Sequence, residues 1–166
     1  LKSLSAEIGE ILTQKGQTIS AAESCTGGLL SHVFTGVSGT SGYFIGGVVA
    51  YSNRIKEAVL GVRPETLQQF GAVSTQTAQE MADGVRARFD TDISVSTTGI
   101  AGPTGGTPEK PVGLVWIGFS TKSGSYTIEC HFDGDRENIK FSTVKKLLSV
   151  LLTDLKKQNK DFEVFS

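Results

Sequence analysis

The sequence predicts an α/β protein in which a mixed sheet of about five strands has helices on both sides. Segments with strand-like and helical patterns alternate along the chain, as they do when helices cover a sheet. Residues 112–120 are nearly continuous in apolar and small side chains, which is typical of a strand buried on both faces. The next strand-like run, residues 126–132, follows after only residues 121–125, which is too short for a parallel crossover. These two strands therefore form an antiparallel hairpin, and the sheet is mixed.

The length and composition fit one soluble domain. The chain has 166 residues, of which 38% are hydrophobic and 20% charged, enough for a core without disulfides or metals. We expect a single domain over residues 1–157 and a polar C-terminal tail over residues 158–166. The net charge of −1 argues against a nucleic-acid partner, and no apolar run reaches the ~18 residues of a membrane span. Two cysteines, Cys25 and Cys130, with neither a C-x-x-C motif nor a secretory leader, favour a cytoplasmic location.

The first half of the chain predicts helices and short strands in turn. Apolar side chains repeat on one helical face up to Leu12, and Gly16 ends that helix. A short strand over residues 18–22 leads to a helix whose apolar residues run from Leu29 to Val37. The remaining elements of this half are a strand over residues 45–50, a helix capped by Ser52 or Asn53, a short helix from Pro64 to Gly71, and a longer helix that begins at Ser74 or Thr75.

The second half begins with a strand over residues 93–97, which leads into a loop over residues 98–113. The hairpin strands follow this loop. The final helix carries its apolar side chains on one face: Ile139, Val144, Leu147, Leu148, Leu151 and Leu155. Open α/β sheets build their sites where strands end, so the segments that begin at Ser24, Tyr51 and Thr98 are the candidates.

Ser24 lies where the first strand breaks into a helix, in the stretch Ala-Glu-Ser-Cys-Thr-Gly-Gly (22–28). Such a turn exposes a hydroxyl and directs the backbone N–H groups of Cys25, Thr26 and Gly27 to the same point, where they can hold a phosphate or an oxyanion. Ser24 is therefore a candidate nucleophile. The simpler alternative is that Ser24 or Thr26 only caps the helix, since serine and threonine are preferred N-cap residues.

Lys56 is a candidate base for this serine. It lies near the start of a helix, just past the strand over residues 45–50 and the tyrosine Tyr51. The helix dipole and partial burial both disfavour an ammonium there, so we expect a lowered pKa and a neutral amine that accepts a proton from a hydroxyl. The alternative is a solvated lysine on a surface helix.

The loop over residues 98–113 holds three of the chain's four prolines and five of its twenty glycines. The prolines stiffen the backbone and the glycines permit unusual dihedral angles, so we predict a shaped, ordered binding loop. The alternative is a purely structural connection over the edge of the sheet.

Common phosphate-binding and metal-binding patterns are absent from the sequence. Neither the P-loop motif nor the dinucleotide-binding glycine motif occurs. The two histidines, His32 and His131, fall on the polar sides of their elements, which weighs against a Ser-His-Asp triad or a zinc site. We therefore expect chemistry without a metal ion or a cofactor.

Several motifs together resemble one known family. They are Ala-Glu-Ser-Cys-Thr-Gly-Gly (22–28), Tyr-Ser-Asn-x-x-Lys (51–56), Gly-Ala-Val-Ser (71–74), and Thr-Gly-Ile-Ala-Gly-Pro-x-Gly-Gly with Glu-Lys-Pro-Val-Gly (98–113). In this order they resemble the C-terminal domain of the competence/damage-inducible protein CinA, the family of nicotinamide-nucleotide amidohydrolases. The resemblance runs to about residue 155. It implies a three-layer α/β/α sandwich and the hydrolysis of nicotinamide mononucleotide to nicotinate mononucleotide and ammonia, in pyridine-nucleotide salvage.

The resemblance also implies roles for individual residues. Ser24 would be the nucleophile, Lys56 the base and Tyr51 a hydroxyl relay between them. Thr98 would be a supporting polar group in the same catalytic set. The substrate-binding positions that we expect are Cys25, Thr26, Gly27, Gly99, Ala101, Gly102, Thr104, Gly105 and Arg136, with Glu23 and Lys110 as weaker candidates.

Two alternatives stay open. Cys25 could be the nucleophile instead of Ser24, because helix N-termini activate thiolates. The domain could also be a non-catalytic nucleotide-binding regulatory module in a competence- or damage-related complex. The expected partner is a small-molecule nucleotide, and the family implies a homo-oligomer, a dimer or larger. Many relatives carry an additional N-terminal domain that this chain lacks, so we expect the stand-alone form.

Overall fold

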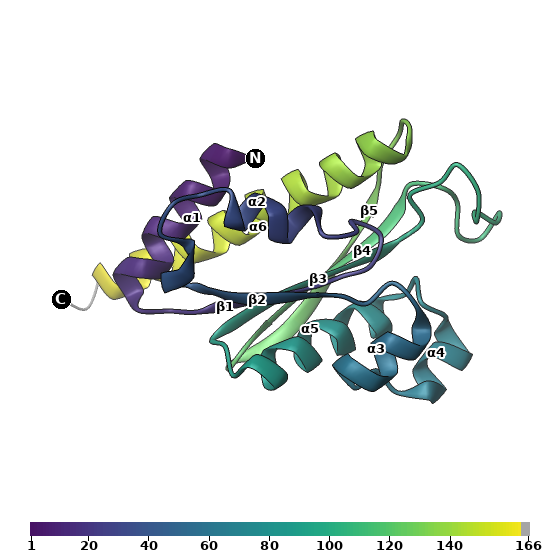
Figure 1. Cartoon of the computed structure of the whole chain (residues 1–166), viewed down its shortest axis with the longest axis horizontal. Coiled ribbons are helices and arrows are strands. Elements are labelled where there is room, and N and C mark those ends of the chain that lie inside the picture. Colours follow the sequence, from purple (N-terminus) through teal and green to yellow (C-terminus); the bar gives the residue numbers. More distant parts are fainter. Residues whose placement is uncertain (164–166) are drawn as a thin grey trace.

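The computed structural model describes the backbone of residues 1–163 and the side chains of residues 1–157. A five-stranded sheet forms its centre, with helices on both faces (Figure 1). In chain order the elements are α1 (Lys2–Lys15), β1 (Ile19–Glu23), α2 (Leu29–Thr35), the 3-10 turn η1 (Thr40–Gly42), β2 (Phe44–Val49), α3 (Asn53–Leu60), α4 (Pro64–Phe70), α5 (Thr75–Phe89), β3 (Ile93–Gly99), β4 (Leu114–Thr121), β5 (Gly124–His131) and α6 (Arg136–Glu163).

The sheet is mixed, as predicted, with the strand order β2-β1-β3-β4-β5. Strand β1 pairs in parallel with β2 on one side and with β3 on the other. Strands β3, β4 and β5 pair antiparallel, and β4 and β5 form the predicted hairpin. Helices α1, α2 and α6 cover one face, and α3, α4 and α5 cover the other (Figure 1). The fold is therefore a three-layer α/β/α sandwich.

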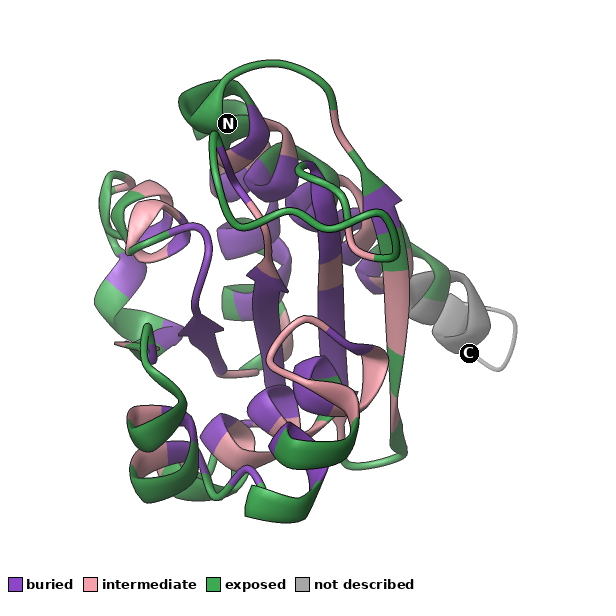
Figure 2. Ribbon diagram, turned by 90° about the vertical axis from the view of Figure 1, so that its right-hand side faces the viewer, coloured by how far each residue is buried: buried purple, intermediate pink, exposed green. Residues whose placement is uncertain are grey.

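The core divides between the two faces of the sheet. A large apolar cluster lies between the sheet and α1, α2 and α6, and it includes the stacked rings of Phe34 and Phe44. A smaller cluster lies under α3, α4 and α5, with Met81 and Val85 at its centre. Figure 2 shows the middle strands as buried along most of their length, with exposed loops around them. Burial on both faces explains why β3 and β4 read as nearly uniform runs of apolar and small residues.

The topology brings three loops to one edge of the sheet. Strands β1, β2 and β3 run in the same direction, so their carboxyl ends meet there. The chain leaves β1 through α2 on one face, and it leaves β2 through α3, α4 and α5 on the other (Figure 1). The helices thus change sides at β1, which makes this edge a topological switch point, where open α/β sheets bind ligands. The segments that follow these strands therefore lie together.

The last helix differs from the prediction at its end. Helix α6 runs to Glu163, past the domain boundary that the sequence predicts at residue 157. The final part of the predicted tail, residues 164–166, lies outside the described residues. Within the described part of the chain, no helix combines the length and the apolar character that a membrane span requires.

Candidate active site

Ser24 occupies a tight turn between β1 and α2. Its N–H donates to the carbonyl of Thr97 on the neighbouring strand at 2.9 Å, and its own carbonyl accepts the N–H of Gly27 at 3.1 Å. No hydrogen bond among the described residues uses the N–H of Cys25 or Thr26 as donor. The turn therefore holds Ser24 by its backbone, and of these two N–H groups the one of Cys25, which lines the pocket described below, is next to it for an incoming oxygen.

Glu23 fills the N-terminus of α2 directly before this turn. Its side chain is 0% exposed and accepts hydrogen bonds from the N–H groups of Gly28, Leu30 and Ser31 at 2.8–3.0 Å. The hydroxyls of Ser31 and Thr26 donate to the same carboxylate at 2.7 and 2.6 Å. Glu23 thus satisfies the helix end from inside the protein, and it does not face a ligand as the sequence suggested.

Lys56 reaches Ser24 from α3. Its Nζ lies 3.0 Å from Ser24 Oγ, and it also donates to the carbonyls of Ala50 at 2.8 Å and Tyr51 at 3.3 Å. The side chain is only 1% exposed, and this burial lowers the pKa of the Lys56 amine below 10.5. Helix α3 starts where it does because the hydroxyl of Ser52 accepts the N–H of Ile55 at 3.3 Å. A buried, direct serine–lysine pair results.

A pocket of about 260 Å³ opens beside this pair. The site residues that the sequence predicts and that line it are Ser24, Cys25, Tyr51, Lys56, Gly99, Ala101, Gly102, Thr104, Gly105 and Arg136. The lining residues that were not predicted as site residues are Asn53, Ala72, Val73 and Ile100. Lys56 and Arg136 are the only charged side chains in this lining, so the pocket suits an anionic or neutral ligand.

Three predicted site residues do not line the pocket: Thr26, Gly27 and Thr98. Thr26 is 0% exposed, and besides Glu23 its hydroxyl contacts the Thr97 hydroxyl at 2.8 Å. Gly27 does not line the pocket, and its N–H belongs to the turn described above. Thr98 is 1% exposed and donates to the carbonyl of Ala72 at 2.7 Å. Thr26 and Thr98 therefore hold the walls in place and do not face the ligand.

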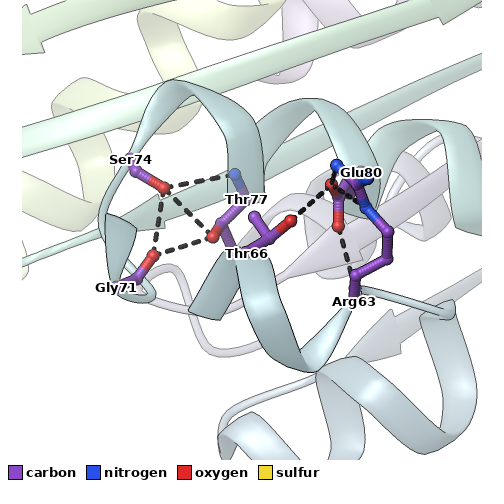
Figure 3. Close-up of polar contacts among 6 residues, drawn as sticks. All are labelled: Arg63, Thr66, Gly71, Ser74, Thr77 and Glu80. Atoms are coloured by element: carbon purple, nitrogen blue, oxygen red, sulfur yellow. Dashed lines mark hydrogen bonds and ion pairs between the residues drawn. The ribbon is translucent and has the colours of Figure 1, made fainter. Parts of the chain in front are cut away.

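The segment Gly71–Ser74 forms one wall of the pocket. It lies between two helices and not at the end of a strand, so the expectation that sites lie at strand ends does not locate it. The Ser74 hydroxyl caps α5 by accepting the N–H of Thr77 at 3.2 Å. The hydroxyls of Ser74 and Thr77 both donate to the carbonyl of Gly71 (Figure 3). A second group joins Arg63, Thr66 and Glu80, which ties α4 to α5 (Figure 3). These contacts fix the turn that presents Ala72 and Val73. The Gly-Ala-Val-Ser motif was its signal in the sequence.

The loop over residues 98–113 is ordered by its own hydrogen bonds. The N–H of Ile100 donates to the carbonyl of Leu114, and the N–H of Gly113 donates back to Ile100. Gly102 has a φ of +73°, and a Cβ atom there would lie 2.5 Å from a methyl group of Val112, so only glycine fits. Lys110 donates to the carbonyl of Phe70 at 2.6 Å, and this hydrogen bond holds the loop against α4. The sequence made Lys110 a weaker candidate for a ligand contact, but its ammonium contacts α4 instead.

Arg136 joins two walls of the pocket. From the start of α6 its Nη1 donates to the carbonyl of Gly102 at 2.7 Å and its Nη2 to the hydroxyl of Tyr51 at 2.8 Å. Tyr51 is 62% exposed. Because Lys56 contacts Ser24 directly, proton transfer between them needs no relay through the Tyr51 hydroxyl, which points to Arg136 instead.

Cys25 is poorly suited to be the nucleophile. It is 6% exposed and packs into the large apolar cluster. Burial raises the pKa of its thiol to about 12, so the thiolate is scarce at neutral pH. Ser24, with a base at 3.0 Å, is the better nucleophile.

Metal ligands do not gather in the described part of the chain. No group of three or more histidine, cysteine or acidic side chains there could hold an ion. Both histidines are exposed, and His131 pairs with Glu129 at 2.7 Å. Within the pocket, Ser24 and Lys56 are the pair that can act as nucleophile and base.

Comparison with known proteins identifies the family to which the chain is similar. The family model described as CinA C-terminal domain matches residues 1–155. The nicotinamide-nucleotide amidohydrolase PncC of Enterobacter agglomerans is 46% identical, over 93% of this chain and 94% of that protein. A putative competence-damage inducible protein of Halothermothrix orenii is 50% identical over 93% of this chain and 38% of its own length. The chain spans a little over a third of the length of most of the curated relatives it matches.

Solved structures share the whole fold. The competence/damage inducible protein CihA of Agrobacterium tumefaciens superimposes with a TM-score of 0.90 at 41% identity, covering 93% of this chain and 94% of that one. A CinA superfamily protein of Klebsiella pneumoniae gives a TM-score of 0.91 at 33% identity, covering 94% and 98%.

Proposed function

The chain belongs to the family of the CinA C-terminal domain, and we propose that it is an amidohydrolase that converts nicotinamide mononucleotide to nicotinate mononucleotide and ammonia. The observation that carries this proposal is the buried contact of 3.0 Å between Lys56 Nζ and Ser24 Oγ at the floor of the pocket. A relative of similar length that is named for this reaction supports the substrate.

Acylation starts from the neutral form of Lys56. Two of its N–H bonds then stay on the carbonyls of Ala50 and Tyr51, and its lone pair faces the Ser24 hydroxyl. Ser24 Oγ attacks the carboxamide carbon as its proton passes to Lys56 Nζ. The carbonyl oxygen becomes an oxyanion, which the N–H group of Cys25 in the pocket lining stabilises.

Ammonia leaves when this intermediate collapses. The C–N bond breaks, and the Lys56 ammonium gives its proton to the departing nitrogen, which leaves an ester on Ser24. Water then attacks the ester carbon while Lys56 accepts one of its protons. The ester bond breaks, Ser24 regains its proton, and the nicotinate product leaves. Protons and bonds balance without a cofactor.

The open side of the pocket would hold the ribose phosphate. Arg136 supplies a cation at the mouth, and the Thr104 hydroxyl with the N–H groups of Ala101, Gly102, Thr104 and Gly105 supplies neutral donors. None of the residues that line the pocket has a carboxylate, which would repel a phosphate. An anionic mononucleotide matches this distribution.

We also infer a setting for the enzyme. The reaction belongs to pyridine-nucleotide salvage, and two free, buried cysteines support a reducing cytoplasm. The uncharged edge strand β2 supports a homo-oligomer, a dimer or larger. A nucleic-acid partner finds no support in a net charge of −1.

The test is ammonia release from nicotinamide mononucleotide by the purified protein beside Ser24→Ala and Lys56→Ala. We expect each variant to keep its thermal transition and to lose activity by at least about a thousandfold. If the unmodified protein binds the nucleotide but releases no ammonia, the non-catalytic binding module replaces this proposal. Unchanged release by both variants would exclude the serine–lysine mechanism.

A further inference from the structure

Asn53 lines the pocket without a role in the mechanism above. It is the first residue of α3, directly after the Ser52 cap. Its side chain is exposed and makes no hydrogen bond within the described part of the chain. The helix start is already capped by Ser52, so its formation does not need the Asn53 amide.

Helix geometry places Asn53 beside the reacting groups. Residues three apart lie on the same helix face, so Asn53 and Lys56 are neighbours there. A helical side chain leans toward the N-terminus of its helix, and Lys56 does so, because its Nζ contacts the carbonyls of Ala50 and Tyr51. The Asn53 amide therefore lies on the side of Ser24 from which Lys56 acts.

A carboxamide substrate needs an acceptor on that side. Its NH₂ group carries two N–H donors that must be satisfied in the pocket. Four nearby carbonyls each already accept a hydrogen bond within the protein: Ala50 and Tyr51 accept from Lys56, Gly102 from Arg136, and Ala72 from Thr98. Asn53 is the only primary amide in the lining, and its Oδ1 is a free acceptor there.

We propose that Asn53 is a specificity-determining residue that recognises the carboxamide of the substrate, an inference that rests on the proposed function. Its Oδ1 accepts one N–H of the substrate NH₂ group. The NH₂ group is then turned toward Lys56 for protonation, and the carbonyl oxygen is turned toward the N–H group of Cys25. Asn53 thus selects the orientation in which Ser24 attacks.

The product differs from the substrate at this contact. A carboxylate has no N–H, so Asn53 must rotate its amide and donate from Nδ2 to bind the acid. An aspartate at the same position accepts but cannot donate. Asn53→Asp therefore keeps the contact to the amide and turns the contact to the acid into repulsion between two carboxylates.

The experiment measures the dissociation constants of both mononucleotides by calorimetry in the Ser24→Ala background, where no turnover occurs. We expect Asn53→Asp to raise the ratio of the acid constant to the amide constant by at least about tenfold. Asn53→Ala should weaken amide binding by about tenfold, the effect of one lost hydrogen bond. Val73→Asp, which adds the same charge elsewhere in the lining, should change the ratio less than about threefold.

Each failure has its own signature. Ammonia release by the unmodified protein, together with ratios in both Asn53 variants within twofold of the parent, overturns the role of Asn53 alone. An equal change in the ratio for Val73→Asp and Asn53→Asp also overturns it, because general charge repulsion then suffices. If the unmodified protein neither hydrolyses nor binds the amide nucleotide, the proposed function fails, and the role of Asn53 fails with it.

Discussion

A lysine that is 1% exposed and holds a serine hydroxyl at 3.0 Å can take a proton only when it is itself neutral. Burial lowers the pKa of Lys56 below 10.5, which enlarges the neutral fraction near neutral pH. The same burial strengthens the hydrogen bonds that aim the amine at Ser24. Burial thus favours the neutral amine and also holds it in line with Ser24.

The pH dependence of activity follows from this position. The base acts in its deprotonated form, so kcat/KM should rise with pH through the lowered pKa of Lys56 and level off above it. Lys56→Arg keeps a cation but cannot become neutral, so ammonia release should fall by about a thousandfold at every pH. Steady-state rates across pH measure both effects. A Lys56→Arg variant with more than a tenth of the parent rate would contradict a lysine base.

Cys25 provides a second test at the residue scale. Because burial raises the pKa of its thiol to about 12, Cys25→Ala should leave kcat within about threefold of the parent. Loss of a small buried side chain should lower the free energy of unfolding by about 1 kcal/mol. Ammonia release and chemical denaturation measure the two quantities. A folded Cys25→Ala protein without activity would make the thiol the nucleophile.

At the scale of elements, α2 depends on a carboxylate from the preceding strand. Glu23 accepts three backbone N–H groups of the helix start and two hydroxyls in a site without solvent. A glutamine there would place its NH₂ group against N–H donors in either orientation. Glu23 therefore fixes the turn that carries Ser24 through the helix that follows it.

We expect Glu23→Gln to lower the free energy of unfolding by about 2 to 4 kcal/mol, because at least one buried N–H group loses its acceptor. Urea denaturation followed by circular dichroism measures the change. Glu57→Gln is the control, since Glu57 is exposed on α3 and should change stability by less than about 0.5 kcal/mol. Equal stability of the two variants would show that the α2 start does not need the Glu23 charge.

The sequence predicts the elements better than the directions of side chains within them. Strand ends and glycine-rich turns locate Ser24, Lys56 and the loop over residues 98–113, because parallel strands end at one edge. Thr26 looks like a ligand contact in sequence, yet its hydroxyl turns to Glu23. Nothing in a linear pattern shows that a buried carboxylate takes the α2 start.

Two parts of the pocket lining, Asn53 and the wall at Ala72, are not found by looking at the ends of strands. Asn53 reads as a possible helix cap, and only the packing of α3 turns it to the pocket. The Ala72 wall depends on a hydrogen bond from Thr98, 26 residues further along the chain. Such long-range contacts are products of the fold, and no local spacing encodes them.

At the scale of the whole molecule, the two edges of the sheet differ in charge. The outer strand β5 carries Glu129 and His131, which discourage pairing with another strand. The other outer strand, β2, has the sequence Phe-Ile-Gly-Gly-Val-Val without a charge. Its Ile45 and Val49 are 50% and 47% exposed. An uncharged edge with exposed apolar side chains offers unpaired backbone groups with little to discourage pairing with another strand.

We therefore expect the protein to dimerise by antiparallel pairing of β2 with its copy, at twice the chain mass of 17.6 kDa in sedimentation equilibrium. Val49→Lys places a charge on this edge and should raise the dimer dissociation constant by at least about tenfold. Val112→Lys is the matched control, because Val112 is 38% exposed on the loop over residues 98–113 and should leave the mass unchanged. A monomeric parent, or a Val49→Lys variant that stays dimeric, would place any assembly on another surface.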